Sequence, residues 1–589
     1  MKQYNYEIRQ KSKIQPTLAK LKAEISELHY SSLLFHVYTA NYIDEEIQNL
    51  QHEILDVFPD ALVAGTSTNG AICQGQLSTN GVVLAATVFD STDVAVYLLD
   101  CPPGNETETG DKIREIIDST SEIKAAEILI TLKSINSRIV LTNAEKKKAD
   151  IHIFGGGSAD ADISGNDTKV ISNDSLSKTG VALVTYSGPD LIVEINHAIG
   201  WKPLGKDFAV TKIEGKHLYE LDNVPAGQIY AKYLDIQADD DFFSNILEFP
   251  IMSHQHGYDV LRLPFSCLKE DNSIILAADI DKGTPVNLSY GDPDVIQADV
   301  RELYNKTLEF APQAIFLYSC GVRRLYWKYL INKETGQFSS IAPVCGFYSS
   351  GEIMNMGDYI IEHHVTLIAV GMREGAKCEI THAHNIDRLL PMSDEQKIHN
   401  QISMVRRLAN FINVTSAELR EANEQLKEIA ETDELTGLYN RRMLHRLVHD
   451  ALHRAKKYNI PMTLGIVDID NFKNVNDTYG HDIGDLVLKR ISEAMYHEIE
   501  KLPSSIFGRW GGEEFLFIAP TLPVERILDN MEEARKRVSS TIIEPVGIVT
   551  ISLGVTEFLP GDTEETLFKR ADDALYEAKN TGKNKSCVK

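Results

Sequence analysis

The sequence lacks several features that would assign it to a class at once. No run of 18 or more apolar residues is present, so no transmembrane helix is predicted. The N-terminal residues are polar and carry no signal-peptide core, so we expect a cytoplasmic protein. The seven cysteines form no CxxC pair, which argues against a zinc site or a disulfide framework. Small buried thiols in a reducing compartment are the simplest interpretation.

Net positive charge is also missing. The formal net charge is -26 over 589 residues, which argues against a nucleic-acid-binding surface. It does not exclude a nucleotide, because local lysines and metal ions can hold a triphosphate on an acidic protein. The length is too great for one hydrophobic core and predicts several domains.

Strand-like and helical patterns alternate over the first two thirds of the chain. Residues 30–225 contain apolar runs such as 32–38 and 81–89, and Gly-rich turns at 65–70 and 154–158. A second stretch, residues 226–385, has similar strands at 314–318 and 364–371. The alternation predicts a multidomain protein whose N-terminal part is an α/β or mixed layered fold.

A helical linker is predicted over residues 392–432. Apolar and small residues recur three and four positions apart, with charged residues around them, which is the pattern of a parallel two-stranded coiled coil. A single amphipathic helix packed on a neighbouring domain is the alternative. The residues of the repeat are Val405, Leu408, Ile412, Thr415, Leu419, Ala422, Leu426 and Ile429.

The last region, residues 433–589, alternates helices and strands in an α+β pattern and carries two acidic clusters. Asp468 and Asp470 end an apolar strand, and a carboxylate there is costly unless it is paired or binds a cation. Gly511-Gly512 predicts a hairpin that places Glu513 just beyond the turn. Brought together, the clusters would form an oxygen-rich Mg²⁺ site. Acidic strand ends and a plain hairpin are the alternative for either piece alone.

Four motifs in order resemble the GGDEF family of diguanylate cyclases, whose C-terminal domain has an α+β fold of the nucleotidyl-cyclase type. The motifs span 433–442, 468–481, 511–515 and 571–584. The resemblance implies Mg²⁺, or Mn²⁺ in its place, held as two ions per active site, with Glu513 and Lys473 as catalytic residues. The implied metal ligands are Asp468, the carbonyl of Ile469, Glu513 and Glu514. The implied GTP-binding residues are Asn476, His481, Asp485, Lys579 and Lys583.

The implied reaction condenses two GTP into cyclic di-GMP and two pyrophosphates. Since each domain binds one GTP, a homodimer must bring two domains face to face. Lys583 stands where the family commonly has arginine, which keeps the charge but loses the bidentate fork. Leu502 and Ser505 replace the Arg and Asp of the family's product-inhibition site, so we expect little feedback inhibition. A non-catalytic GTP-binding receptor is the alternative function.

Five looser motifs in the first two thirds resemble the FIST sensory family, N-terminal and C-terminal halves together. They span 65–70, 154–160, 200–205, 318–324 and 343–353. The resemblance implies a small-molecule sensor that controls the cyclase through the linker, with Ser319, Arg323 and Glu352 as a candidate ligand site. Haem is a further candidate group. Its candidate ligands are His36, His197, His363 and His364.

Overall fold

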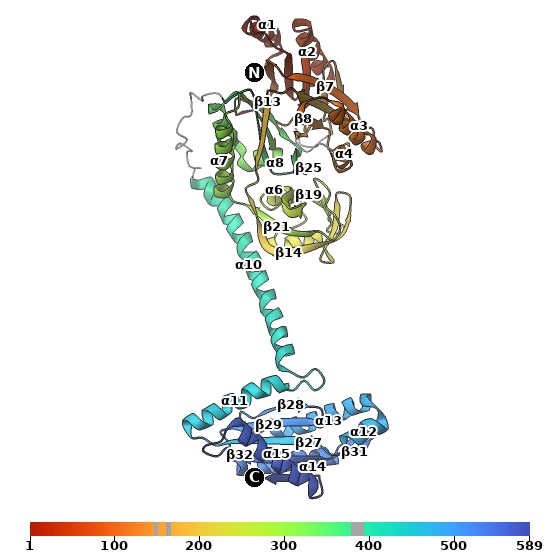
Figure 1. Ribbon diagram of the computed structural model, residues 1–589, viewed down its shortest axis with the longest axis vertical. Helices are drawn as coiled ribbons and strands as arrows, with labels where there is room; N and C mark the ends of the chain where they lie inside the picture. The colour runs from red at the N-terminus through yellow and green to blue at the C-terminus, as the bar shows by residue number, and fades with distance from the viewer. Residues whose placement is uncertain (146–150, 161–165, 378–393) are drawn as a thin grey trace. The chain divides into compact units, whose positions relative to one another are not determined.

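The computed structural model describes residues 1–145, 151–160, 166–377 and 394–589, which form two compact units, Met1–Val414 and Thr415–Lys589 (Figure 1). The end of the predicted second sensory stretch (378–385), the start of the predicted linker (392–393) and Cys378 lie outside the described residues. No described helix is long and apolar enough to cross a membrane.

Three six-stranded sheets with one common strand order dominate the first unit. The first sheet runs β1 (Lys2–Ile8), β6 (Gly81–Phe89), β2 (Ser32–Ala40), β3 (Leu62–Ser67), β10 (Val170–Ser172), β11 (Ser175–Ser177). The second runs β7 (Asp93–Asp100), β12 (Gly180–Ser187), β8 (Ile123–Ile130), β9 (His152–Gly157), β24 (Glu352–Met356), β25 (Tyr359–His363). The third runs β13 (Leu191–Ala198), β26 (Leu367–Glu374), β22 (Ala314–Cys320), β23 (Val344–Ser349), β4 (Ala71–Cys73), β5 (Gln76–Ser78).

The chain therefore contains a structural repeat that occurs three times. Each repeat has an edge strand, a helix, a parallel pair of strands joined by helical structure, a hairpin and an antiparallel return strand. The helices are α1 (Ile14–Ile25), α2 (Asp44–Val57), α3 (Glu106–Ser119), α4 (Ser137–Ala144), α7 (Pro293–Phe310), α8 (Gly321–Trp327) and α9 (Ile331–Thr335). The hairpin of each repeat joins the sheet of another repeat, so the three sheets interlock.

One glycine occupies the same place in each repeat. Gly65, Gly155 and Gly346 lie opposite Val37, Ile128 and Leu317 in the three parallel pairs. A Cβ atom at these glycines would come within 2.0, 1.9 and 1.9 Å of the carbonyl oxygen of the opposite residue. Only glycine permits this close approach of two strands.

An inserted sheet interrupts the third repeat between β13 and α7. Its order is β18 (Tyr258–Arg262), β17 (Ile251–Gln255), β21 (Pro285–Gly291), β14 (Trp201–Glu214), β15 (His217–Leu221), β20 (Ile274–Leu276), β19 (Pro264–Cys267), with β16 (Val224–Pro225) beside β15. Helices α5 (Ala226–Leu234) and α6 (Phe242–Ile246) complete its core. The predicted boundary between residues 225 and 226 falls inside this insert, while strands from both sides of it share the second and third sheets.

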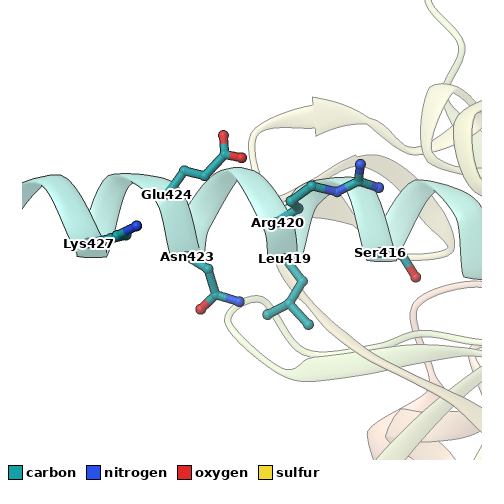
Figure 2. Close-up of a pocket in the computed structure, with 6 residues that line it drawn as sticks. All are labelled: Ser416, Leu419, Arg420, Asn423, Glu424 and Lys427. Atoms are coloured by element: carbon teal, nitrogen blue, oxygen red, sulfur yellow. The ribbon is translucent and has the colours of Figure 1, made fainter. Parts of the chain in front are cut away.

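Helix α10 (Asp394–Glu431) packs on the insert through residues 404–414. Phe411 is buried there, with Met404, Leu408 and Val414 packed beside it. Arg407 donates hydrogen bonds to the carbonyl and side-chain oxygens of Asn245. An apolar stripe beside this packed face stays exposed, and its members are 61% to 66% exposed: Val405, Ile412, Leu419, Leu426 and Ile429. Figure 2 shows Leu419 and Asn423 projecting to one side of α10 while Arg420 and Glu424 project to the other.

The second unit is a five-stranded sheet covered by helices on both faces. The order is β28 (Ile506–Gly511), β29 (Glu514–Pro520), β27 (Met462–Ile469), β32 (Ile551–Glu557), β33 (Ser586–Val588). Helices α11 (Arg441–Tyr458) and α15 (Glu564–Asn580) share one core, and α12 (Phe472–Tyr479), α13 (His481–Ile499) and α14 (Leu528–Ser540) share the other. A short ribbon pairs β30 (Ile542–Ile543) with β31 (Gly547–Ile548).

Candidate functional site

The tip of the β28–β29 hairpin lies beside the end of β27. Register places Asp468 directly opposite Glu514, and the Ile469 N–H donates to the Glu513 carbonyl at 3.3 Å. Gly512 has φ of 55°, a conformation that favours glycine, and a Cβ atom at Gly511 or Gly512 would meet nothing within 4 Å. The two predicted acidic clusters are therefore neighbours at an open turn.

Asp468 is a buried carboxylate with a cation beside it. The residue is 6% exposed, and the Lys579 ammonium lies 2.6 Å from its Oδ2. Burial raises the pKa of Asp468, as do the charges of Glu513 and Asp470, while Lys579 opposes the rise. Burial, followed by the charge of Asp468, also raises the pKa of Glu514. This crowding of carboxylates favours a bound cation.

The donor set matches the preferences of Mg²⁺. Within the described residues no three His, Cys, Asp or Glu side chains converge as a complete metal cage. Mg²⁺ seldom uses such a cage in proteins, because it keeps waters and binds one or two carboxylates together with substrate phosphates. Asp468 and Glu513, with the carbonyl of Ile469, offer that partial set at an open turn.

Asp470 lies two residues further on but has a different role. Its side chain accepts hydrogen bonds from Thr550 Oγ1 at 2.7 Å, Ser552 Oγ at 2.7 Å and the Asn584 N–H at 3.0 Å. Asp470 thus ties the end of β27 to the loop after α15, which carries Lys583. Sequence reasoning paired Asp470 with Asp468 and missed this difference, which only the positions of β32 and the last loop reveal.

The predicted guanine-binding residues come from two consecutive helices. Gly480, with φ of 85°, separates α12 from α13, and its N–H donates to the Asn476 carbonyl at 2.9 Å. Asn476 packs so tightly on α13 that a Cβ atom on Gly484 would lie 1.9 Å from Asn476 Oδ1. The next residue, Asp485, is exposed, as is His481. Asn476 therefore lies beside α13 at Gly484, one residue away from the exposed Asp485.

The three predicted lysines approach the same end of the sheet from different elements. Lys473 is exposed on the first turn of α12. Lys579, on the last turn of α15, contacts Asp468. Lys583 has φ of 59°, and its ammonium donates to Asn471 Oδ1. Lys579 was expected to bind phosphate, and here it neutralises the principal predicted metal ligand.

Arg509 connects the hairpin with the start of the domain, and sequence reasoning did not single it out. Its guanidinium donates to the Gly512 carbonyl at 3.0 Å and contacts both Asp433 oxygens at 3.3 Å. Asp433 lies two residues after the end of α10 and also accepts from the Thr436 N–H at 3.0 Å. The hairpin tip and the turn after α10 are thus joined through one side chain.

In the first unit, the candidate ligand residues are buried among protein partners. Arg323 is fully buried, pairs with Glu334, and donates to the Ile199 and Val365 carbonyls at 2.8 and 2.9 Å. Glu352 accepts from the Ser349 hydroxyl and, at 3.1 Å, from the Thr366 N–H, and burial raises its pKa to about 8. Arg323 and Glu352 therefore hold the two ends of one turn, 365–366.

Ser319 lies beside this group. It is buried in β22, and its carbonyl accepts from the Ser349 hydroxyl at 3.4 Å. Its own hydroxyl has no hydrogen-bond partner among the described residues. The three predicted residues are neighbours, and a ligand would reach them only by displacing these protein contacts.

Three family models match the chain in consecutive segments. The model described as "Diguanylate cyclase, GGDEF domain" matches residues 430–585. The C-terminal region is a GGDEF domain. Models of the FIST N and FIST C domains match residues 33–224 and 226–355, in the expected order.

The curated relatives match through the GGDEF domain. The diguanylate cyclase DgcM of Escherichia coli (strain K12) is 35% identical over 168 residues, which are 28% of this chain and 40% of DgcM. The response regulator PleD of Caulobacter vibrioides is 38% identical over 175 residues, 28% of this chain and 37% of PleD. The chain thus spans about two fifths of the length of these relatives. The solved GGDEF domain of DgcB from Caulobacter crescentus, in complex with c-di-GMP, is 34% identical to this chain. The match covers 27% of this chain and 95% of the DgcB domain, with a TM-score of 0.26.

The four histidines proposed as haem ligands lie in the FIST region in three settings. His36 Nε2 is 2.8 Å from Glu127 Oε2 in the buried core. His197 and His363 have ring centroids 5.8 Å apart. Neither ring nitrogen of His363 has a hydrogen-bond partner among the described residues, while His364 Nε2 lies 3.3 Å from Glu362 Oε1. Burial lowers the pKa of both well below the usual value, so both rings are neutral.

Proposed function

We propose that the chain is a diguanylate cyclase that condenses two GTP into cyclic di-GMP and two pyrophosphates. The observation that carries this proposal is the juxtaposition of Asp468 with Glu513 and Glu514 at an open Gly-Gly turn. The relatives named as diguanylate cyclases or carrying a solved GGDEF domain support it. Residues suited to guanine and phosphate lie on the neighbouring elements α12, α13 and α15.

Each group has a chemical task in this reaction. Mg²⁺ held by Asp468, the Ile469 carbonyl, Glu513 and Glu514 would polarise the α-phosphate and stabilise the pyrophosphate oxygens. Glu513 accepts the proton of the attacking 3′-hydroxyl. Asn476 and Asp485 hydrogen-bond the guanine edge, with His481 nearby, and Lys473 stabilises the transition-state charge. Lys579 leaves Asp468 and, with Lys583, binds the phosphates. The ion pair between Lys579 and Asp468 would then be replaced by a contact of Lys579 with phosphate and a contact of Asp468 with the metal ion.

Catalysis requires two domains, because one GGDEF domain holds one of the two GTP molecules. The exposed stripe on α10 supports a homodimer: Val405, Ile412, Leu419 and Leu426 repeat every seven residues, the spacing of one seam of a two-stranded coiled coil. An apolar stripe of this regularity would be costly if it stayed in water. The seam holds two domains at high effective concentration.

The FIST region controls the cyclase through α10 in this proposal. Leu408 occupies a seam position of the heptad pattern, yet it packs on the insert together with Phe411. It cannot serve both surfaces at once. A small ligand that loosens or tightens the insert therefore changes how far the coiled coil extends, and with it the encounter of the two active sites.

The decisive test is product identification with the full chain. Purified protein is incubated with GTP and Mg²⁺, and the nucleotides are separated by chromatography and identified by mass. Cyclic di-GMP and pyrophosphate are expected, and Glu513→Ala abolishes both. The exposed Glu500→Ala is the matched control and retains full activity. GTP that binds but is recovered unchanged would instead support the non-catalytic receptor.

A further inference from the structure

Two cysteines that are far apart in the sequence face each other across adjacent strands. Cys73 in β4 is the direct register partner of Cys345 in β23. The first belongs to the hairpin of the first repeat, and the second to the central strand pair of the third repeat. No sequence pattern predicts this pairing, because the exchange of hairpins between sheets depends on tertiary packing.

The hydrogen bonds around the pair define its geometry. The Gln74 N–H donates to the Val344 carbonyl at 2.8 Å, and the Tyr348 N–H donates to the Gly70 carbonyl at 2.8 Å. Hydrogen-bonded and non-hydrogen-bonded pairs alternate along an antiparallel ladder. Gln74 and Val344 are a hydrogen-bonded pair, so Cys73 and Cys345, one step along, are a non-hydrogen-bonded pair.

Side chains are closest at such pairs. Cα atoms of a non-hydrogen-bonded pair are about 4.5 Å apart, and both side chains project to the same face of the sheet. Disulfides join residues whose Cα atoms are about 4.4 to 6.8 Å apart. Both cysteines also belong to the same hydrophobic core, with Cys345 fully buried and Cys73 partly buried against it.

We propose that Cys73 and Cys345 are a reversible disulfide site that fastens the β4–β5 hairpin to β23. Both cysteines carry free thiols in this structure. Oxidation would lock a contact between the first and third repeats, directly before the strand end that carries Ser349. This modification site is independent of the proposed cyclase activity.

The reaction needs an oxidant, and oxidised glutathione or another small disulfide supplies it. The Cys73 thiolate attacks one sulfur of the small disulfide, releases one thiol, and forms a mixed disulfide. Cys345 then loses its proton, attacks the Cys73 sulfur and releases the second thiol. One small disulfide is reduced to two thiols while one protein disulfide forms. Cys73 reacts first because it is the partly exposed member of the pair.

The environment makes the site slow to respond. Burial raises the pKa of Cys73 to about 11, and that of Cys345 well above its usual value. Little of the Cys73 thiolate is present at neutral pH. The rate of its attack on the small disulfide therefore rises about tenfold per pH unit below the pKa of Cys73. Gln3 Nε2, on β1, donates to the Cys345 sulfur at 3.5 Å. The site therefore reports sustained oxidation rather than a brief pulse.

The test uses the full reduced chain, incubated to equilibrium with oxidised glutathione at pH 8.5. The product is expected to weigh two hydrogen atoms less, to yield a linked Cys73–Cys345 peptide, and to migrate faster on a non-reducing gel, because the disulfide closes a loop of about 270 residues. Its thermal midpoint rises, and dithiothreitol reverses all of these changes. Cys73→Ser and Cys345→Ser each abolish the gel shift. Cys320→Ser, a buried cysteine outside the pair, retains it.

Two outcomes would overturn the proposal. One is a stable glutathione adduct on Cys73 with no internal disulfide, which would mean that Cys345 cannot reach the first sulfur. The other is an unreacted Cys73–Cys345 pair at equilibrium in the most oxidising buffer while the half-buried Cys587 is modified. The modification of Cys587 is the internal control, because it proves that the oxidant was active.

Discussion

The GGDEF domain and the FIST region use their polar residues in opposite ways. In the GGDEF domain, three motif side chains on α12 and α13 are exposed: Lys473, His481 and Asp485. A Cβ atom at Gly480, between the two helices, would meet nothing within 4 Å. In the FIST region, Arg323 and Glu352 are buried and bonded to the protein itself. Polar motif residues are thus open to a ligand in one region, while in the other they join the parts of an interlocked fold.

The largest expected effect is a loss of activity that distinguishes Asp468 from Asp470 at the end of β27. Asp468→Asn should lower cyclase activity on the order of 10³-fold, because it removes the proposed ligand of a metal ion that would stabilise transition-state charge. Its free energy of unfolding should change by less than about 1 kcal/mol, since burial already opposes the charge of Asp468. Activity is measured as cyclic di-GMP formed, and stability by urea unfolding.

Asp470→Asn is the matched variant and should give the reverse pattern. It disturbs three hydrogen bonds to a buried carboxylate and should destabilise the domain by about 2 to 4 kcal/mol. Activity falls less than in Asp468→Asn and recovers in part at lower temperature. Equal losses of activity and stability in both variants would contradict the division of roles between the two residues.

The second effect concerns the stripe on α10. Ile412→Lys combined with Leu419→Lys puts charges into the predicted seam and should convert the dimer to a monomer, with a fall in specific activity of about tenfold or more at low protein concentration. Sedimentation velocity gives the oligomeric state. Glu424→Lys, on the side of α10 away from Leu419, is the control and should remain dimeric (Figure 2). A monomeric wild-type protein with full activity would contradict the proposed coiled-coil dimer.

The third effect tests whether the FIST repeats are equivalent. Gly65→Ala, Gly155→Ala and Gly346→Ala should each destabilise the first unit by about 3 kcal/mol, because every added methyl would meet a strand carbonyl within 2.0 Å. Gly205→Ala, where a Cβ would meet nothing within 4 Å, should be neutral. Urea unfolding in a Trp510→Phe background leaves only Trp201 and Trp327, both in the first unit, as fluorescent reporters. If only one of the three variants were destabilised, the three repeats would not be equivalent.

Sequence patterns predicted the GGDEF domain more closely than the FIST region, for a physical reason. The alternation of helices and strands predicted for residues 433–589 is present, and helix α11 (Arg441–Tyr458) shows why, since its caps and its apolar face are local signals. The Gly-Gly hairpin between β28 and β29 is also a local signal, whereas the register that joins Asp468 to Glu514 pairs β27 with β29 across two helices. The FIST repeats escaped prediction because each hairpin pairs with a strand from another repeat. Such pairings depend on tertiary packing, as do the partners of Arg323 and the meeting of Cys73 with Cys345.

The fourth effect is a pH dependence specific to the FIST region. The pKa of Glu352 is about 8 in the native state, against 4.5 in an unfolded chain. The native state therefore binds more protons between these values, and the free energy of unfolding falls as pH rises from 5 to 8, by at most about 1.4 kcal/mol per pH unit. Glu352→Gln should flatten this slope. A slope that is unchanged in the variant would mean that Glu352 is ionised throughout.

The smallest expected effect is an absence of response in the GGDEF domain. The resemblance puts the product-inhibition residues at positions 502 and 505, where this chain has Leu502 and Ser505. Leu502 is 7% exposed and packs in the core beside α13, so it offers cyclic di-GMP no guanidinium. Added cyclic di-GMP should therefore leave the initial rate of pyrophosphate release unchanged. Leu502→Arg combined with Ser505→Asp restores the family pair and should introduce inhibition, provided its thermal midpoint shows that the domain is folded. Strong inhibition of the wild-type protein would show that cyclic di-GMP acts at another site. The proposed division between a catalytic GGDEF domain and a regulatory FIST region would then fail.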